Sequence, residues 1–240
     1  MNKTYEAETA RTALARQLAA EAMVLLKNEG GLLPLPKGKT VALLGQTQLD
    51  TVIGGGGSGA SFSEGTLQIR NELVKAGLAV EASMDGFYRE LSKKRREESS
   101  KSRSPFADFE GLVASGLIYE IFGQYSAARE EPIPGEECDR RVENDYYLTP
   151  SEKRLLELAC GHFENVMAVF NCNGMVDMSC TKTCPNIKAA LFMGTAGEQA
   201  AGALADLITG RATPSGKLIS LKSSRGRRRY SSISTGPLSG

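Results

Sequence analysis

The sequence lacks a large net charge, a long apolar run and a leader pattern. Its 29 Lys and Arg residues nearly balance 28 Asp and Glu residues, for a formal net charge of +1, so no global field attracts nucleic acid or an anionic membrane. No stretch approaches the roughly 20 apolar residues that cross a bilayer. The N-terminus mixes acids and bases where a signal peptide has a basic start and an apolar block. We therefore expect a cytoplasmic protein that binds neither nucleic acid nor membrane.

Metal-binding side chains are also scarce. The only histidine is His162, and the five cysteines are Cys138, Cys160, Cys172, Cys180 and Cys184. An odd number of cysteines favours reduced thiols over a disulfide framework. Cys180 and Cys184 lie together in SCTKTC, but a structural zinc site normally takes four ligands and the histidine lies in another segment. We predict no metal site and no cofactor, and we interpret His162 as a helix-end or surface residue.

Helical and strand-like segments alternate along the chain. Helices are expected over residues 7–27, 64–77 and 195–210 and from Pro150 onward, and strands over 40–45, 78–83, 165–171 and 186–194. The first helix is predicted from apolar residues at helical spacing, and the strands from short apolar runs next to small-residue turns. This alternation is typical of an α/β protein, here a three-layer α/β/α sandwich with a mainly parallel sheet.

Two stretches interrupt the alternation. Residues 89–104 mix both signs of charge without apolar periodicity or aromatic residues, which predicts a solvated helix end or loop rather than a nucleic-acid patch. Residues 106–128 carry apolar and aromatic side chains but too many glycines for one helix. We therefore interpret 89–134 as an irregular charged and connecting insertion within one domain.

Three small-residue turns follow predicted strands, and ligands of open α/β sheets bind beyond the carboxyl ends of the strands. The most conspicuous turn is IGGGGSG at 53–59. A phosphate-binding loop would place a lysine and a hydroxyl residue after the last glycine, whereas Ala60 and Ser61 follow Gly59. The run also begins about eight residues after Gly45, too late for a tight turn into a dinucleotide-binding helix. Nucleotide binding is therefore disfavoured.

A second candidate is the loop PGEECDRR at 134–141, which holds three carboxylates beside two arginines. Glycoside cleavage uses one carboxylic acid to protonate the leaving oxygen and a second carboxylate across the sugar. The spacing is equally compatible with an exposed charged loop, so the residues alone leave both readings open.

Several motifs occur together and in order: AAEAMVLLKNEGGLLPL, VALLG, GGGGSG with EGTLQIRNEL, GEECDR before NDYYLTPSEKRLLE, and PNIKAALFMGTAGEQAAGALADLITGRATPSGKL. Together they resemble the α/β-sandwich domain of glycoside hydrolase family 3, the β-glucosidase and β-xylosidase family, over roughly residues 8–219. The resemblance implies an active site shared with a (β/α)₈ barrel, which supplies the aspartate nucleophile. The sandwich supplies the general acid/base glutamate in many members.

The resemblance also implies roles for particular residues. Glu136 matches the general acid/base position, and Glu137 stands where the family more often has a small residue. The substrate-binding residues implied are Gly55, Gly56, Gly57, Ser58, Asp139 and Arg140. The glycine loop would form a rim of the glycoside site facing the barrel. No nucleophile can be named in this chain.

The sequence departs from the family in three places. The 240 residues leave no room for a barrel of about 250, and Met1 directly precedes the sandwich, as in the branch with inverted domain order. EEPIP at 130–134 replaces a helix and an apolar strand, which leaves open whether the sheet lacks one strand and whether Glu136 is well placed. Residues 220–240 form a basic, Ser- and Gly-rich tail predicted to be disordered, for which a frameshift or truncated gene is our hypothesis.

We therefore expect residues 1–219 to be the sandwich part of a retaining β-glucosidase-like hydrolase that acts on β-linked glucosides or oligosaccharides in carbohydrate metabolism. Without the barrel it is expected to be inactive, and an exposed barrel-docking face would promote self-association. The alternative is a non-catalytic module that binds a carbohydrate or a partner.

Overall fold

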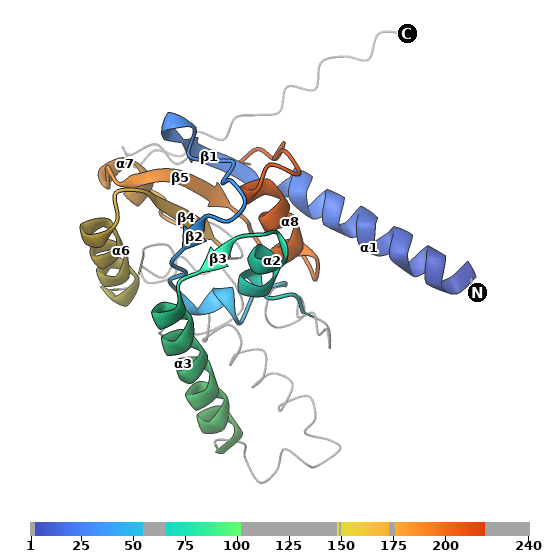
Figure 1. Cartoon of the computed structure of the whole chain (residues 1–240), viewed down its shortest axis with the longest axis horizontal. Helices are drawn as coiled ribbons and strands as arrows, with labels where there is room; N and C mark the ends of the chain where they lie inside the picture. Colours follow the sequence, from blue (N-terminus) through green and yellow to red (C-terminus); the bar gives the residue numbers. More distant parts are fainter. Residues whose placement is uncertain (1–2, 55–65, 102–147, 149, 173–175, 219–240) are drawn as a thin grey trace.

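A computed structural model of the chain describes residues 3–54, 66–101, 148, 150–172 and 176–218 (Figure 1). The elements are α1 (Lys3–Ala22), β1 (Val24–Asn28), η1 (Glu29–Gly31), β2 (Thr40–Val41), η2 (Gln46–Gln48), α2 (Ile69–Lys75), β3 (Ala79–Val80), α3 (Ala82–Lys101), α6 (Pro150–His162), β4 (Val166–Phe170), α7 (Cys180–Thr183), β5 (Ile187–Phe192) and α8 (Ala200–Ile208). None of the described helices is long and apolar enough to cross a membrane.

The strands form two sheets. A three-stranded sheet has the order β1–β5–β4, and a two-stranded sheet joins β2 to β3. β4 runs parallel to β5 and β2 runs parallel to β3, whereas β1 lies antiparallel to β5 with Val24 opposite Phe192. The α/β architecture is confirmed, and two of the three strand pairs among the described residues are parallel.

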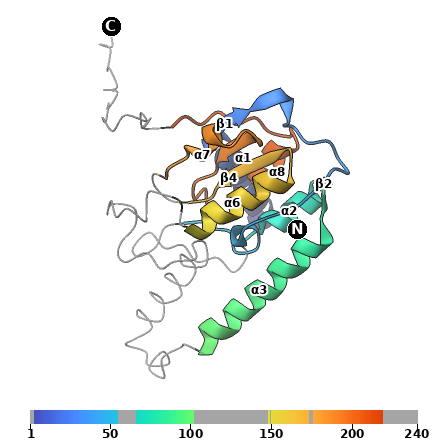
Figure 2. The same ribbon diagram turned by 90° about the vertical axis from the view of Figure 1, so that its left-hand side faces the viewer.

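Helices cover both faces of β5, which gives the expected three layers (Figure 2). On one face, Leu191 belongs to a core that includes Leu73 of α2 and Leu204 of α8. On the other face, Ile187 and Ala190 pack with the side chains of α6 and α7. Ala190 and Leu191 face opposite sides because successive side chains alternate across a sheet. Ile187 shares the face of Ala190 because the register with β4 shifts by one residue between Ile187 and Ala189.

The prediction of one helix over 7–27 is wrong beyond Ala22. The chain leaves the helix at Met23, whose side chain is fully buried, and Val24–Asn28 forms β1. Val24, Leu25 and Leu26 continue the apolar spacing of the helix, but they also fit an edge strand. Pairing with β5 decides between the two, since tertiary contacts outweigh weak intrinsic propensity.

The strand predicted over 40–45 is confirmed only at its first two residues, as β2. The strand predicted over 78–83 is confirmed only at Ala79–Val80, as β3, and its last two residues belong to α3 instead. Among the described residues, β2 pairs with β3 alone and β4 pairs with β5 alone. The helix expected over 64–77 spans Ile69–Lys75. In contrast, the charged segment 89–104 is helical as far as Lys101, within α3, which extends away from the two sheets (Figure 2).

Candidate functional site

The residues predicted for the site fall outside the described residues. They are Gly55, Gly56, Gly57 and Ser58 in the segment 55–65, and Glu136, Asp139 and Arg140 in the segment 102–147. The structure describes the residues on either side of these two segments. Val52 and Ile53, just before the first of these segments, lie at the carboxyl ends of β4 and β5.

Asn171, the first residue after β4, joins three separate parts of the chain. Its Oδ1 accepts a hydrogen bond from Val52 N at 2.9 Å, and its Nδ2 donates to Val52 O and to Gly194 O, both at 2.8 Å. Asn171 is 8% exposed, so its side-chain amide is largely removed from water. We call this arrangement the Asn171 clasp. It ties the entry of the glycine loop to the ends of β4 and β5.

The base of the glycine loop is closed by two further contacts. Gly197 N donates to Ile53 O at 3.0 Å, and Ile69 N donates to Thr51 Oγ1 at 3.3 Å. The first contact joins the loop entry to the turn after β5, and the second joins it to the start of α2. Gly197 has a φ of 78°, a backbone conformation that favours glycine. Both ends of the loop are therefore anchored at the carboxyl edge of the sheet.

A cavity of about 560 Å³ lies beside this edge, between β2 and β4. Its lining comes mainly from the unpaired edges of these two strands and from α6, with Val41, Val169 and Leu156 among the side chains. Gln46 and Gln48 also line it, and their Oε1 atoms are buried without a hydrogen-bond partner in the described part of the protein. Among the described residues, the strands β2 and β4 that line the cavity belong to separate sheets.

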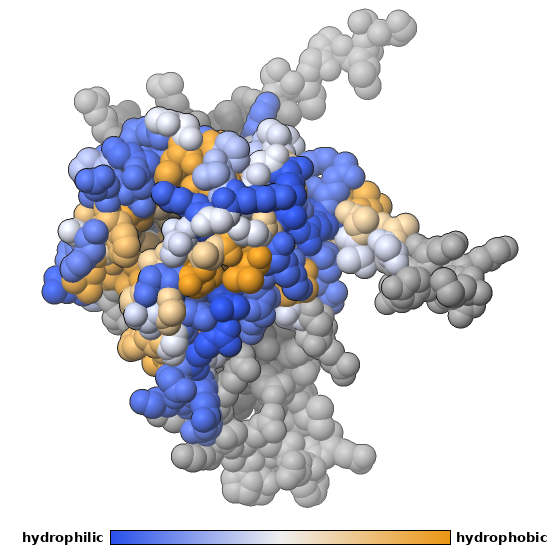
Figure 3. Space-filling model, in the orientation of Figure 1, coloured by the Kyte–Doolittle hydropathy of each residue, from blue (hydrophilic) through white to orange (hydrophobic). Residues whose placement is uncertain are grey.

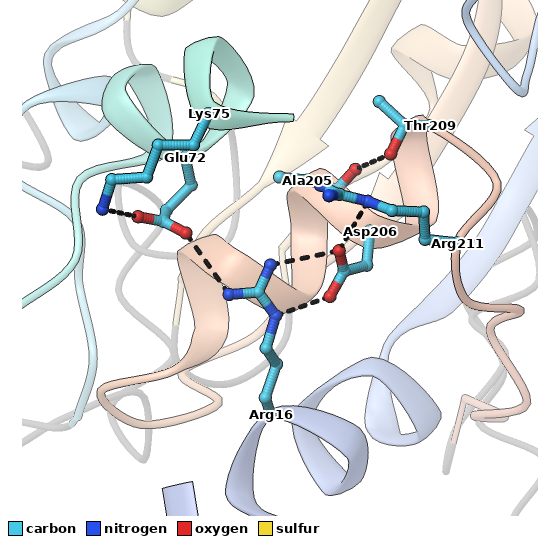
Figure 4. Close-up of polar contacts among 7 residues, drawn as sticks. All are labelled: Arg16, Glu72, Lys75, Ala205, Asp206, Thr209 and Arg211. Atoms are coloured by element: carbon cyan, nitrogen blue, oxygen red, sulfur yellow. Dashed lines mark hydrogen bonds and ion pairs between the residues drawn. The ribbon is translucent and has the colours of Figure 1, made fainter. Parts of the chain in front are cut away.

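An ion-pair network outside this edge connects the helices on one face (Figure 4). Arg16 of α1 contacts Asp206 of α8 and Glu72 of α2, while Lys75 and Arg211 bind the same two carboxylates. Hydrogen bonding to Asp206 is the main cause that raises the pKa of Arg16. The carboxylates of Glu72 and Asp206 are occupied by these cations, so we interpret the network as structural.

The remaining candidates behave as simple surface or packing groups. His162 is the last residue of α6, is exposed and has Nδ1 2.8 Å from Leu158 O, which confirms the helix-end interpretation. Among the described residues, no three His, Cys, Asp or Glu side chains are grouped to hold a metal ion. Figure 3 shows apolar residues at the surface over α6, where Leu158 and Phe163 are 43% and 42% exposed.

Sequence reasoning placed the glycine loop at this edge but missed the residue that anchors it. Asn171 is a polar residue that directly follows the apolar run VMAVF. A polar amide at the carboxyl end of a buried strand was the available signal, because such a group must find hydrogen-bond partners when it is buried.

The fold and this edge define an α/β-sandwich domain whose loops gather at the carboxyl ends of its strands. The profile described as "Glycosyl hydrolase family 3 C-terminal domain" matches residues 23–222. The chain therefore belongs to the glycoside hydrolase family 3 C-terminal domain family. The boundary predicted at residue 219 stays a prediction.

Curated relatives are β-glucosidases. The chain is 29% identical over 234 residues to beta-glucosidase A of Butyrivibrio fibrisolvens, covering 85% of this chain and 28% of the relative. It is 30% identical over 226 residues to thermostable beta-glucosidase B of Acetivibrio thermocellus, covering 90% and 27%. The chain thus spans little more than a quarter of the length of these relatives.

Solved structures agree with the fold. Beta-glucosidase 3B from Thermotoga neapolitana in complex with glucose has a TM-score of 0.68 and 27% identity, covering 88% of this chain and 31% of that one. A beta-glucosidase from Paenibacillus barengoltzii has a TM-score of 0.66 and 28% identity, covering 87% and 24%.

Proposed function

We propose that this chain is the sandwich part of a retaining β-glucosidase-type glycoside hydrolase. In this proposal its carboxyl edge forms one wall of the glucoside site, and a (β/α)₈ barrel forms the other and supplies the nucleophile. Glu136 acts as general acid/base, protonating the leaving oxygen in the first step and deprotonating water in the second. Asp139, Arg140 and the glycine loop contact the sugar.

The observation that carries the proposal is the Asn171 clasp. It anchors Val52, at the entry of the glycine loop, against Gly194 at the end of β5. Positioned loops at the carboxyl ends of strands are the usual ligand-binding part of open α/β sheets. The β-glucosidase names of the relatives support the choice of a glucoside as substrate.

The proposal is tested with an aryl β-glucoside as substrate. The 240-residue chain alone should release no more aryl alcohol than buffer, because both carboxylates must act on one sugar. Activity should return when the chain is joined to a family 3 barrel. In that two-domain protein, Glu136→Ala should lower kcat by at least about 100-fold, the usual contribution of general acid–base catalysis.

Glu137→Ala is the matched control, since it removes a neighbouring carboxylate of the same loop. It should change kcat only a few-fold. The loss of kcat/KM caused by Glu136→Ala should be smaller for a dinitrophenyl glucoside, whose leaving group needs little protonation in the first step. Turnover by the chain alone, or equal losses in the two variants, would contradict the proposed division of roles. Calorimetric titration with glucose and cellobiose tests the alternative binding module, for which the chain alone would bind sugar tightly.

A further inference from the structure

Three cysteines from two parts of the chain meet on the face of β5 that α6 covers. Cys160 lies in the last turn of α6, Cys180 begins α7 and Cys184 follows α7 directly. All three belong to the cluster around Ile187 and Ala190. Cys180 is 8% exposed, whereas Cys160 and Cys184 are partly exposed. The two accessible thiols therefore come from different elements.

Hydrogen bonds of Asn186 and Ile187 connect the segments that carry Cys160 and Cys184. The side chain of Asn186 donates to Cys160 O at 2.7 Å and to Phe163 O at 2.9 Å, which fastens the end of α6 to the turn before β5. On the other side of that turn, Ile187 N donates to Cys184 O at 3.1 Å. Both side chains pack against the same small core of Cys180, Ile187 and Ala190. Burial is the main cause that raises the pKa of Cys160, and the neighbouring Cys184 adds to it.

Cys180 is a poor partner for either thiol. Cys184 N donates to Cys180 O at 2.9 Å, so these residues are separated by one helical turn. Residues four apart on a helix have Cβ atoms about 5–6 Å apart, whereas a disulfide needs about 3.5–4.5 Å. Burial also raises the pKa of Cys180 to about 11, which leaves little of the thiolate that reacts with disulfides.

We propose that Cys160 and Cys184 are an oxidation site, which low-molecular-weight disulfides such as glutathione disulfide convert to a disulfide between α6 and the turn before β5. The thiolate of Cys184 attacks one sulfur of glutathione disulfide, forms a mixed disulfide and releases one glutathione thiolate. The thiolate of Cys160 then attacks the Cys184 sulfur and releases the second glutathione thiolate. The two protein thiols are oxidised, one disulfide is reduced, and the two thiol protons pass to the two glutathiones.

The bond would have a defined structural effect. The chain between the two cysteines contains β4 and Asn171, so the bond closes a covalent loop around the strand that carries the Asn171 clasp. It also fixes the end of α6, and Leu155 and Ala159 of this helix line the cavity between β2 and β4. The site does not depend on the proposed glycosidase activity.

The test uses the full 240-residue chain, incubated with glutathione disulfide, alkylated and mapped by mass spectrometry after digestion. The expected main product is a peptide pair joined through Cys160 and Cys184. The melting temperature should rise by roughly 5–10 °C on oxidation and fall back with dithiothreitol. Cys160→Ser and Cys184→Ser should each abolish the cross-link and the shift, whereas Cys172→Ser, the matched control, should retain both.

Mapping the unmutated chain does not require any variant to fold. Stable glutathione adducts on Cys160 or Cys184 without a cross-link, or a predominant cross-link through Cys138, Cys172 or Cys180, would overturn the proposal.

Discussion

Arg16 donates two hydrogen bonds to the carboxylate of Asp206, from Nε to Oδ2 at 2.5 Å and from Nη2 to Oδ1 at 3.0 Å. The fork geometry of the guanidinium matches the two carboxylate oxygens, which makes this one of the stronger classes of ion pair. A third contact, from Nη1 to Glu72 Oε2 at 3.3 Å, extends it to α2. One side chain of α1 therefore fixes two helices of the core (Figure 4).

Replacing Arg16 with Met should lower the free energy of unfolding by about 2 kcal/mol. The reason is that the side chains of Glu72 and Asp206 are only 5% and 17% exposed and would each lose a partner. Urea unfolding followed by circular dichroism measures the change. Arg154→Met is the matched control, because its partner Glu157 is 68% exposed, and it should cost less than about 0.5 kcal/mol. Equal losses would show that the Arg16 network is no more than a surface ion pair.

Gly202→Ala should act through the same arginine. A Cβ atom at position 202 would lie 2.7 Å from Cζ of Arg16 and closer still to Nη1, so the guanidinium must shift and its contacts with Glu72 and Asp206 are disturbed. The single substitution should therefore destabilise the protein although alanine favours helices. In a double-mutant cycle, Gly202→Ala should cost clearly less in the Arg16→Met background than in the wild type. Additive losses would mean that the clash is relieved elsewhere.

Asn171→Ala should lower the free energy of unfolding by about 2–3 kcal/mol, since it leaves the N–H and C=O of Val52 and the C=O of Gly194 without this partner. Asn171→Asp should cost at least as much above neutral pH, because a carboxylate would face two carbonyl oxygens. Asn28→Ala is the control: Asn28 makes the same kind of contacts with Leu33 but is exposed, so water replaces them. Hydrogen exchange at Val52 reports the loss directly.

The ion pair between Asp85 and Arg70 should make the stability of the folded protein decrease at acid pH. Its carboxylate accepts hydrogen bonds from Arg70 Nε at 2.9 Å and Nη2 at 2.8 Å, and these bonds are the main cause that lowers its pKa below the ordinary value of 3.8. A lowered pKa in the folded state stabilises the protein fully above pH 3.8 and less as pH falls through the folded value. Chemical unfolding at several pH values should show a shallower acid loss in Asp85→Asn than in the wild type. If the free energy of unfolding fell equally with decreasing pH in the two proteins, the stabilising role of the Asp85 carboxylate would be contradicted.

The sequence was informative where a single segment decides its own structure. β4, β5 and α8 follow from apolar runs of the right length and from Gly210, which ends α8 with a φ of 75°. The prediction from sequence failed at Val24–Asn28, because these residues are compatible both with the apolar spacing of a helix and with an edge strand. Only the distant partner β5 resolves that ambiguity.

The candidate site was predictable in its location and less so in its construction. The turn after β5 and the glycine loop both follow predicted strands, so their meeting at one edge follows from parallel topology. The Asn171 clasp and the Arg16 network were missed because each joins residues more than 50 positions apart. Contacts between residues so far apart cannot be deduced from the spacing or the composition of the sequence.

The pairing of β1 with β5 also has a consequence for synthesis on the ribosome. β1 leaves the ribosome well before β5 (Ile187–Phe192), its only described strand partner. At ordinary elongation rates the interval is on the order of ten seconds. Throughout that time Val24 and Leu26 have no sheet to join, and α1 has no α8 to pack against. The nascent chain therefore presents an apolar N-terminal segment to chaperones until α8 has been made.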